Sequence, residues 1–310
     1  MTTAAKAAPS WRPAAFRWLL AVVATALLAT AAYNVDFPAV RRGILAADGR
    51  WLLVAVTANL LVQPLAALQW RALLPATVPI SWRRLLRIFA ITSVANNSAS
   101  SLIGHATGVA ILAKEPSVGA RGALSLLVLD QVAVGVAKGA VLLTAASLLP
   151  LPVWMQRGAF VLAGTLGVVA VVALLYARPL PFARSVATLP FVRSFVAVPP
   201  ARMLVGVCCA LAVKCLEAGG IAAVQLAFGF SCTIVSVVYV LAATTLASLV
   251  PIIPGNLGAY EAAVFLALRH IGAAQAPAMA IAVVQHACQL LAALAPGAPL
   301  LWFPYRRTAP

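Results

Sequence analysis

Acidic residues are scarce in this chain, which has 6 Asp and Glu among 310 residues and only 9% charged residues. A soluble globular domain carries about 25% charged residues, so the composition excludes a soluble fold. The scarcity also leaves few positions for an enzyme that uses two carboxylates. The acids are Asp36, Asp48, Glu115, Asp130, Glu217 and Glu261.

Two other chemistries lack their motifs. The 5 cysteines show no CxxC spacing and lie in apolar stretches, so we interpret them as small buried hydrophobic residues and expect neither disulfides nor a metal site. No GxxxxGK[ST] segment is present, which argues against nucleotide-driven chemistry. We therefore expect no cofactor.

Long apolar stretches dominate the chain, with 64% hydrophobic residues and a mean hydropathy of +1.02. A membrane-spanning helix needs about 20 mostly apolar residues. Six stretches qualify, at about residues 14–33, 51–70, 122–148, 159–177, 203–228 and 277–302. The first follows basic residues as in a signal peptide, but an uncleaved span is the simpler interpretation because the rest of the chain also spans the membrane.

Two further apolar regions, about 85–113 and 234–268, are interrupted by polar and helix-breaking residues. The interruptions read ANNSASSLIGHATG and VPIIPGNLGAYE. We expect each region to form two short helical arms of a re-entrant hairpin, although two full spans would also fit. Irregular backbone at membrane depth is tolerated only against protein or a water-filled cavity, so both breaks should face an interior site.

The basic residues report the topology, because cytoplasmic loops are enriched in Lys and Arg. With six crossings and the N-terminus inside, fifteen of the 22 basic residues are cytoplasmic: Lys6, Arg12, Arg17, Arg71, Arg83, Arg84, Arg87, Lys114, Arg121, Arg178, Arg184, Arg193, Arg202, Arg306 and Arg307. Both termini are therefore predicted to be cytoplasmic. The net charge of +16 is explained by orientation and does not require a nucleic acid partner.

The two breaks also indicate an internal repeat within a single transmembrane domain of residues 1–310. Gly104 and Thr107 in the first break correspond to Gly258 and Glu261 in the second, at an offset of 154 residues. Residues 1–155 and 156–310 then each contain two spans, a hairpin and a third span. Three crossings per half is an odd number, so the halves should be inverted relative to each other, as in many transporters.

Charged residues inside apolar spans normally face a partner or a cavity, because a charge near the bilayer centre costs about 2.5 to 3.5 kcal/mol. Lys214 and Glu217 are three residues apart and form either a self-neutralising pair or a substrate-facing pair. Asp130 has no partner within four residues and is expected to pair with Lys138, two turns away, or with Lys214 on another helix, to become protonated or to face water.

The breaks and the last span supply the remaining candidates. Glu261 is either a helix cap or part of an anion site at a helix N-terminus. His105 is expected to be a hydrogen-bonded structural histidine, with a proton shuttle as the alternative, and His286 should bond between helices or line a cavity. The predicted translocation site comprises Asn96, Asn97, Gly104, His105, Asp130, Lys214, Glu217, Pro254, Gly255, Asn256, Gly258, Glu261 and His286.

The segment SLVPIIPGNLGAYEAAVFLALRHIGAAQAPAMAIAVV resembles the most characteristic segment of the lysylphosphatidylglycerol synthase transmembrane-region family of flippase-like membrane proteins. That family shows a Pro-Gly-Gly-x-Gly-x-x-Glu pattern, and Asn256 replaces its second glycine here. NNSASSLIGHATGVAILAKEPSVGARGALSLLVLD resembles the first half more loosely. Family members commonly have an acid and an arginine around that break and an arginine in the last span, where this chain has His105, Thr107 and His286.

The resemblance implies a bacterial inner-membrane protein that moves lipids or lipid-linked precursors between leaflets and is not an enzyme, since the family's synthases use a separate soluble domain. A membrane-embedded glycosyl- or phosphotransferase is an alternative, and only Asp36 and Asp48 offer it a carboxylate at the outer face. A non-transporting subunit that works with a lipid-biosynthesis enzyme is another. The oligomeric state is not predicted.

Overall fold

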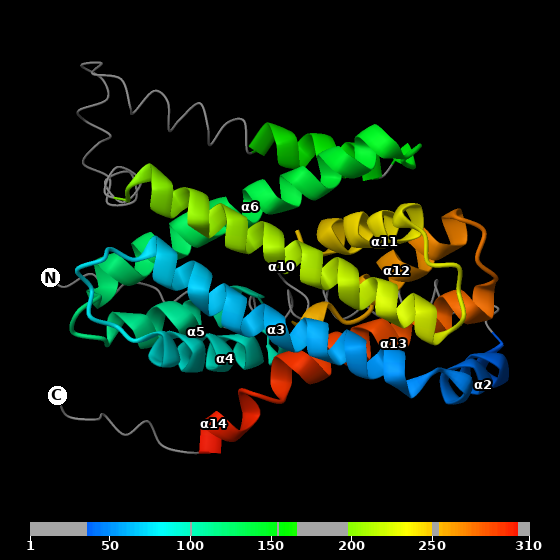
Figure 1. Cartoon of the computed structure of the whole chain (residues 1–310), viewed down its shortest axis with the longest axis horizontal. Helices are drawn as coiled ribbons and strands as arrows, with labels where there is room; N and C mark the ends of the chain where they lie inside the picture. The colour runs from blue at the N-terminus through cyan, green and yellow to red at the C-terminus, as the bar shows by residue number, and fades with distance from the viewer. Residues whose placement is uncertain (1–35, 100, 154, 166–197, 250–253, 303–310) are drawn as a thin grey trace, which may run out of the picture.

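The structure is a computed structural model, and it describes residues 36–99, 101–153, 155–165, 198–249 and 254–302. Within these ranges every regular element is a helix (Figure 1). The all-helical architecture is therefore confirmed for the described part of the chain. Four helical segments there are long and apolar enough to cross a membrane: Gly49–Leu73, Gly119–Leu148, Pro200–Ala227 and Gln275–Leu300.

These four segments match four of the six predicted spans. The predicted span at 14–33 lies outside the described residues, and that at 159–177 is described, as helix, only to Thr165. The last segment consists of α13 (Gln275–Leu294) and the short α14 (Ala298–Trp302). Pro296 and Gly297 separate them, because a proline cannot continue the hydrogen-bond ladder of the preceding turn.

The centre of the fold is an antiparallel pair of long helices, α3 (Gly49–Leu73) and α10 (Pro200–Ala227) (Figure 1). At one end the Asp48 N–H donates to the Ala227 carbonyl (2.9 Å), and at the other the Arg202 guanidinium donates to the Leu74 carbonyl. Glycine on α10 allows close packing, since a Cβ at Gly206 would lie 2.6 Å from the Leu73 side chain.

The first broken region folds into two antiparallel helices, α4 (Trp82–Ser98) and α5 (Ser101–Ala113). Arg84 near the start of α4 pairs with Glu115 just after α5 (2.9 Å), so the outer ends of the two arms lie together. The arms also pack tightly at the break, where a Cβ at Gly104 would lie 2.5 Å from the Asn96 Cβ.

This break is shorter than its sequence indicates. Only Ala99 and Ser100 separate α4 from α5, so Asn96 and Asn97 belong to α4 and Gly104 and His105 to α5. Two of the polar side chains bond within their own helix, the Asn97 amide to the Ser93 carbonyl (2.8 Å) and the Thr107 hydroxyl to the Ile103 carbonyl (2.8 Å).

The second broken region consists of α11 (Ile234–Ala247), the 3₁₀ turn η1 (Pro254–Asn256) and α12 (Ala259–His270). Its backbone has positive φ at Gly255 (55°), Asn256 (55°) and Gly258 (81°). Asparagine tolerates this left-handed conformation better than other residues with a Cβ. Asn256 can therefore stand where the family pattern has a glycine.

Two of the remaining helices pack against both broken regions. The helix α6 (Gly119–Leu148) packs on α5, α10 and α11, and α13 packs on α12, α3 and α4. A short helix, α2 (Phe37–Ala46), lies against α13. The end of α4 meets η1, where a Cβ at Gly255 would lie 2.7 Å from the Asn97 carbonyl oxygen. The structure thus brings the two breaks into contact.

Candidate functional site

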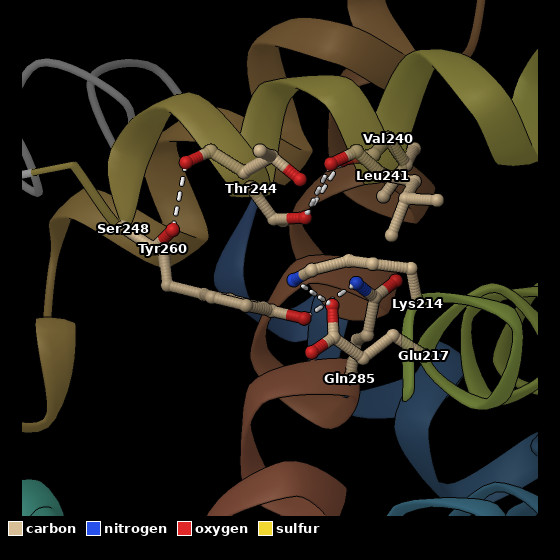
Figure 2. A network of polar contacts seen from close by, with 9 residues as sticks. Lys214, Glu217, Val240, Leu241, Thr244, Ser248, Tyr260 and Gln285 are labelled. Carbon is tan, nitrogen blue, oxygen red and sulfur yellow. Dashed lines mark hydrogen bonds and ion pairs between the residues drawn. The ribbon is translucent and has the colours of Figure 1, made fainter. Parts of the chain in front are cut away.

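A polar cavity of about 70 Å³ lies among α3, α10, α11, α12 and α13, next to η1. One water molecule needs at least about 10 to 15 Å³ of such space, so the cavity has room for several. Figure 2 shows side chains of α10, α12 and α13, among them Lys214, Tyr260 and Gln285, pointing toward one another. The lining residues are Asn59, Lys214, Glu217, Gly220, Ile221, Thr244, Thr245, Ser248, Asn256, Tyr260, Gln285 and Gln289.

Lys214 and Glu217 provide the charges of the cavity. They lie near the middle of α10, and the Lys214 Nζ is 2.7 Å from the Glu217 Oε2 (Figure 2). The pair is half-buried, and Lys138 on α6 is close enough to interact with both charges. The self-neutralising interpretation of the pair is therefore confirmed, and the pair also faces the cavity.

A second polar group joins α12 to α13 beside the cavity. The Glu261 Oε2 accepts from the Gly258 N–H (2.8 Å), so the helix-cap interpretation of Glu261 is confirmed and its carboxylate satisfies that N–H. The Glu261 Oε1 lies 2.9 Å from the Nδ1 of His286, whose ring stacks on Tyr260 with centroids 4.5 Å apart. The Gln285 amide donates to the Tyr260 hydroxyl (2.8 Å).

His286 therefore bonds between helices, whereas its neighbours Gln285 and Gln289 line the cavity. Gln285 and Gln289 are four residues apart and share one face of α13. His286 lies on an adjacent face and takes only the first of the two roles that the sequence left open for it, whereas Gln285 lines the cavity and also bonds between helices, to Tyr260.

Two lining groups have a buried polar atom without a hydrogen-bond partner. The Gln285 side chain is 3% exposed and leaves its Oε1 unsatisfied, and Thr245 is 2% exposed and leaves its hydroxyl unsatisfied. The neighbouring hydroxyls do have partners. That of Thr244 donates to the Val240 carbonyl (3.0 Å), and that of Ser248 donates to the backbone carbonyl of Thr245 (2.7 Å). An unsatisfied buried polar atom costs about 1 to 3 kcal/mol, so these atoms favour a bound polar group.

Asp130 lies elsewhere, and its expected pairing with a lysine is wrong. Its Oδ1 accepts from the Gln69 amide (2.8 Å) and the Trp70 indole (3.0 Å), and its Oδ2 accepts from Gln131 (3.2 Å). Across the described residues it makes no ion pair. Asp130 is buried against α3 and does not line the cavity, so its contacts join α6 to α3.

The first break contributes less than the sequence predicts. The described lining of the cavity contains none of the predicted residues of the first break, which are Asn96, Asn97, Gly104 and His105. No hydrogen bond to another described residue reaches the half-buried His105 ring, so the expected hydrogen-bonded histidine is not found. His105 instead lies within electrostatic range of Lys138.

The second break contributes more directly. Asn256 lines the cavity, Gly258 and Glu261 form the adjacent cap, and Gly255 contacts the first break. Pro254 begins η1. The structure thus gathers Lys214, Glu217, Asn256, Glu261 and His286 around one cavity.

Among the lining residues that the sequence reasoning missed are Asn59, Thr244, Thr245 and Ser248. Each is an uncharged polar residue in an otherwise apolar helix or at its end. A search for such residues within the spans would have found them, whereas a search for charges did not.

The comparisons with known proteins agree with the suspected family. The family described as the lysylphosphatidylglycerol synthase TM region matches residues 17–297. No curated protein and no solved structure gives a significant match. The matched region contains every residue of the cavity and all but the last five residues of the described part, and the chain belongs to the lysylphosphatidylglycerol synthase transmembrane-region family.

Proposed function

We propose that this protein moves the polar head group of a membrane lipid or lipid-linked precursor between leaflets, along an interior path that includes the polar cavity. The observation that supports this proposal is the Lys214–Glu217 ion pair. It lies near the middle of α10, a helix apolar enough to span a membrane, and it faces the cavity. Buried charges in membrane proteins are costly and mark substrate pathways. Head groups are the polar part of a lipid, so a polar interior path suits them.

Re-entrant hairpins would place the breaks inside the membrane. The arms α4, α5, α11 and α12 have 17, 13, 14 and 12 residues. At about 1.5 Å per residue they are roughly 18 to 26 Å long, which is less than the hydrocarbon thickness of about 30 Å. The Arg84–Glu115 pair at the outer ends of the first hairpin supports a return to the side of entry.

An inverted repeat is supported by matched contacts between the halves. The equivalent spans α3 and α10 pack antiparallel, as an axis in the membrane plane requires. The third span of each half packs on the hairpin and on the second span of the other half: α6 on α11 and α10, and α13 on α4 and α3. The two breaks meet between the halves.

The remaining parts of the proposal follow from the topology. We place the protein in the bacterial inner membrane with both termini cytoplasmic, on the count of basic residues. We propose a transporter without catalytic activity, whose partners are its lipid and a lipid-biosynthesis enzyme. The carboxylates of Asp36 and Asp48 support no transferase, because they cap α2 and α3 by accepting from the N–H groups of Ala39 and Arg50.

Reconstitution tests the proposal. Purified protein is placed in liposomes that carry trace fluorescent lipids with anionic, zwitterionic and glycosyl head groups, and outer-leaflet fluorescence is quenched chemically. For at least one lipid we expect the inner-leaflet fluorescence to be lost rapidly to the quencher. The rate should be slower for Glu217→Gln, which breaks the ion pair. Protein-free liposomes and Thr57→Val, an exposed change outside the cavity, are the controls. Rates equal to those of protein-free liposomes for every one of these lipids would overturn it.

A further inference from the structure

We propose that the polar cavity binds an uncharged, hydroxyl-bearing part of the head group, such as a glycerol or sugar diol, in preference to a bare phosphate or ammonium group. The cavity and its free hydrogen-bonding atoms carry the inference. It rests on the proposed function only in assigning the hydroxyls to a lipid.

The unsatisfied atoms call for a ligand that both donates and accepts hydrogen bonds. The Gln285 Oε1 and the Thr245 hydroxyl are buried, have no partner and belong to residues that line the same cavity. An oxygen acceptor needs an N–H or O–H, which a bare phosphate dianion lacks. A hydroxyl of a ligand both donates and accepts, so it can bond to the Gln285 amide and to the Thr245 hydroxyl.

The charges of the cavity oppose a charged ligand of either sign. Lys214 and Glu217 already neutralise each other at 2.7 Å. A phosphate that approached Lys214 would meet the Glu217 carboxylate, and an ammonium group that approached Glu217 would meet the Lys214 ammonium. A hydroxyl can accept from Lys214 and donate to Glu217 without separating them.

The size of the cavity suits part of a head group. Room for several water-sized groups accommodates a diol edge while the remainder of the lipid stays outside. The neighbouring amides of Asn256 and Gln289 offer further donors and acceptors to such an edge.

Binding to the full-length protein in detergent tests the inference without requiring transport. The probes are short-chain phosphatidylglycerol and short-chain glucosyl diacylglycerol, compared with phosphatidic acid and phosphatidylethanolamine of equal chain length. We expect at least one hydroxyl-bearing probe to bind about tenfold more tightly than the other two, since two average hydrogen bonds supply at least that factor. The pair of probes distinguishes a glycerol from a sugar source. Equal or tighter binding of phosphatidic acid or phosphatidylethanolamine would overturn the proposal.

Isosteric variants then test the residues. Thr245→Val should weaken binding of the preferred probe roughly fivefold, because it removes one hydrogen bond. The matched control is Thr92→Val, since Thr92 is also buried but bonds its hydroxyl to the Ile88 carbonyl outside the cavity. Thermal unfolding in the same detergent shows whether both variants fold. If Thr245→Val does not fold, Gln285→Met removes the other unsatisfied hydrogen-bonding group instead.

The outcomes separate this inference from the proposed function. Unchanged affinity in folded Thr245→Val or Gln285→Met overturns the assignment of the cavity, even where liposomes show translocation. Selective binding that depends on both residues, together with no movement of the same lipid in liposomes, retains the site and removes the transport function.

Discussion

The contact between the two breaks is the most directly testable feature of the fold, through Gly255→Ala. A Cβ at Gly255 would lie 2.7 Å from the Asn97 carbonyl oxygen, a backbone atom that cannot rotate away. The residue also has φ of 55°, a conformation that costs about 1 to 2 kcal/mol for an L-residue with a side chain. Overpacking adds about 1 to 3 kcal/mol. We therefore expect the free energy of unfolding to fall by about 2 to 5 kcal/mol.

A matched control separates the contact from the backbone strain. Gly229 has φ of 63° and nothing within 4 Å of a built Cβ, so Gly229→Ala carries the strain without the contact. Both variants are unfolded by a denaturing detergent titrated into mixed micelles, and their free energies are compared with that of the parent. We expect Gly255→Ala to be less stable than Gly229→Ala by about 1 to 3 kcal/mol. Equal losses would refute the contact between the breaks.

Three pairs of substitutions address other contacts, with the same unfolding measurement. Asp130→Leu should lower the free energy of unfolding by at least about 2 kcal/mol, since it strands buried N–H donors, and Asp130→Asn should cost less; equal losses would contradict the hydrogen-bonded role. Gly104→Ala should destabilise the first hairpin, whereas Gly219→Ala, which meets nothing within 4 Å, should stabilise α10 by about 0.5 to 1 kcal/mol. Glu261→Ala should cost about 2 to 4 kcal/mol, and Glu261→Gln about half as much because its oxygen still accepts from the cap; a neutral Glu261→Ala would exclude a structural role for the His286 contact.

The long apolar stretches of this chain predict its long helices well because a membrane-spanning segment must satisfy its own backbone. The spans at 51–70 and 122–148 lie within α3 and α6, and that at 203–228 runs one residue past the end of α10. The exact extent of the first break was less predictable. Ser and Asn are frequent at helix ends, but α4 and α5 hold several polar side chains within the helix, where those of Asn97 and Thr107 bond to their own backbone, and the sequence does not distinguish these two outcomes.

The candidate site was predicted in part for a similar reason. Lys214, Glu217 and Glu261 stand out because a charge in an apolar run is rare. Asp130 stands out equally, but its fate depended on Gln69 and Trp70, which lie 61 and 60 residues away in the sequence. Only the packing of α3 against α6 brings those donors to the carboxylate, and no local spacing reports it.

The two halves of the chain contribute unequally to the lining of the cavity. Its described lining comes from the second hairpin, α10, α13 and Asn59 of α3, so only α3 represents the first half. The first hairpin instead closes on η1 beside the cavity, through Asn97 and Gly255. In the inverted repeat that we propose, the halves would exchange roles during translocation, and the same closure would open on the opposite side. The asymmetry of the lining then belongs to one state of the cycle, and the contact at Gly255 is the point at which the two states would differ.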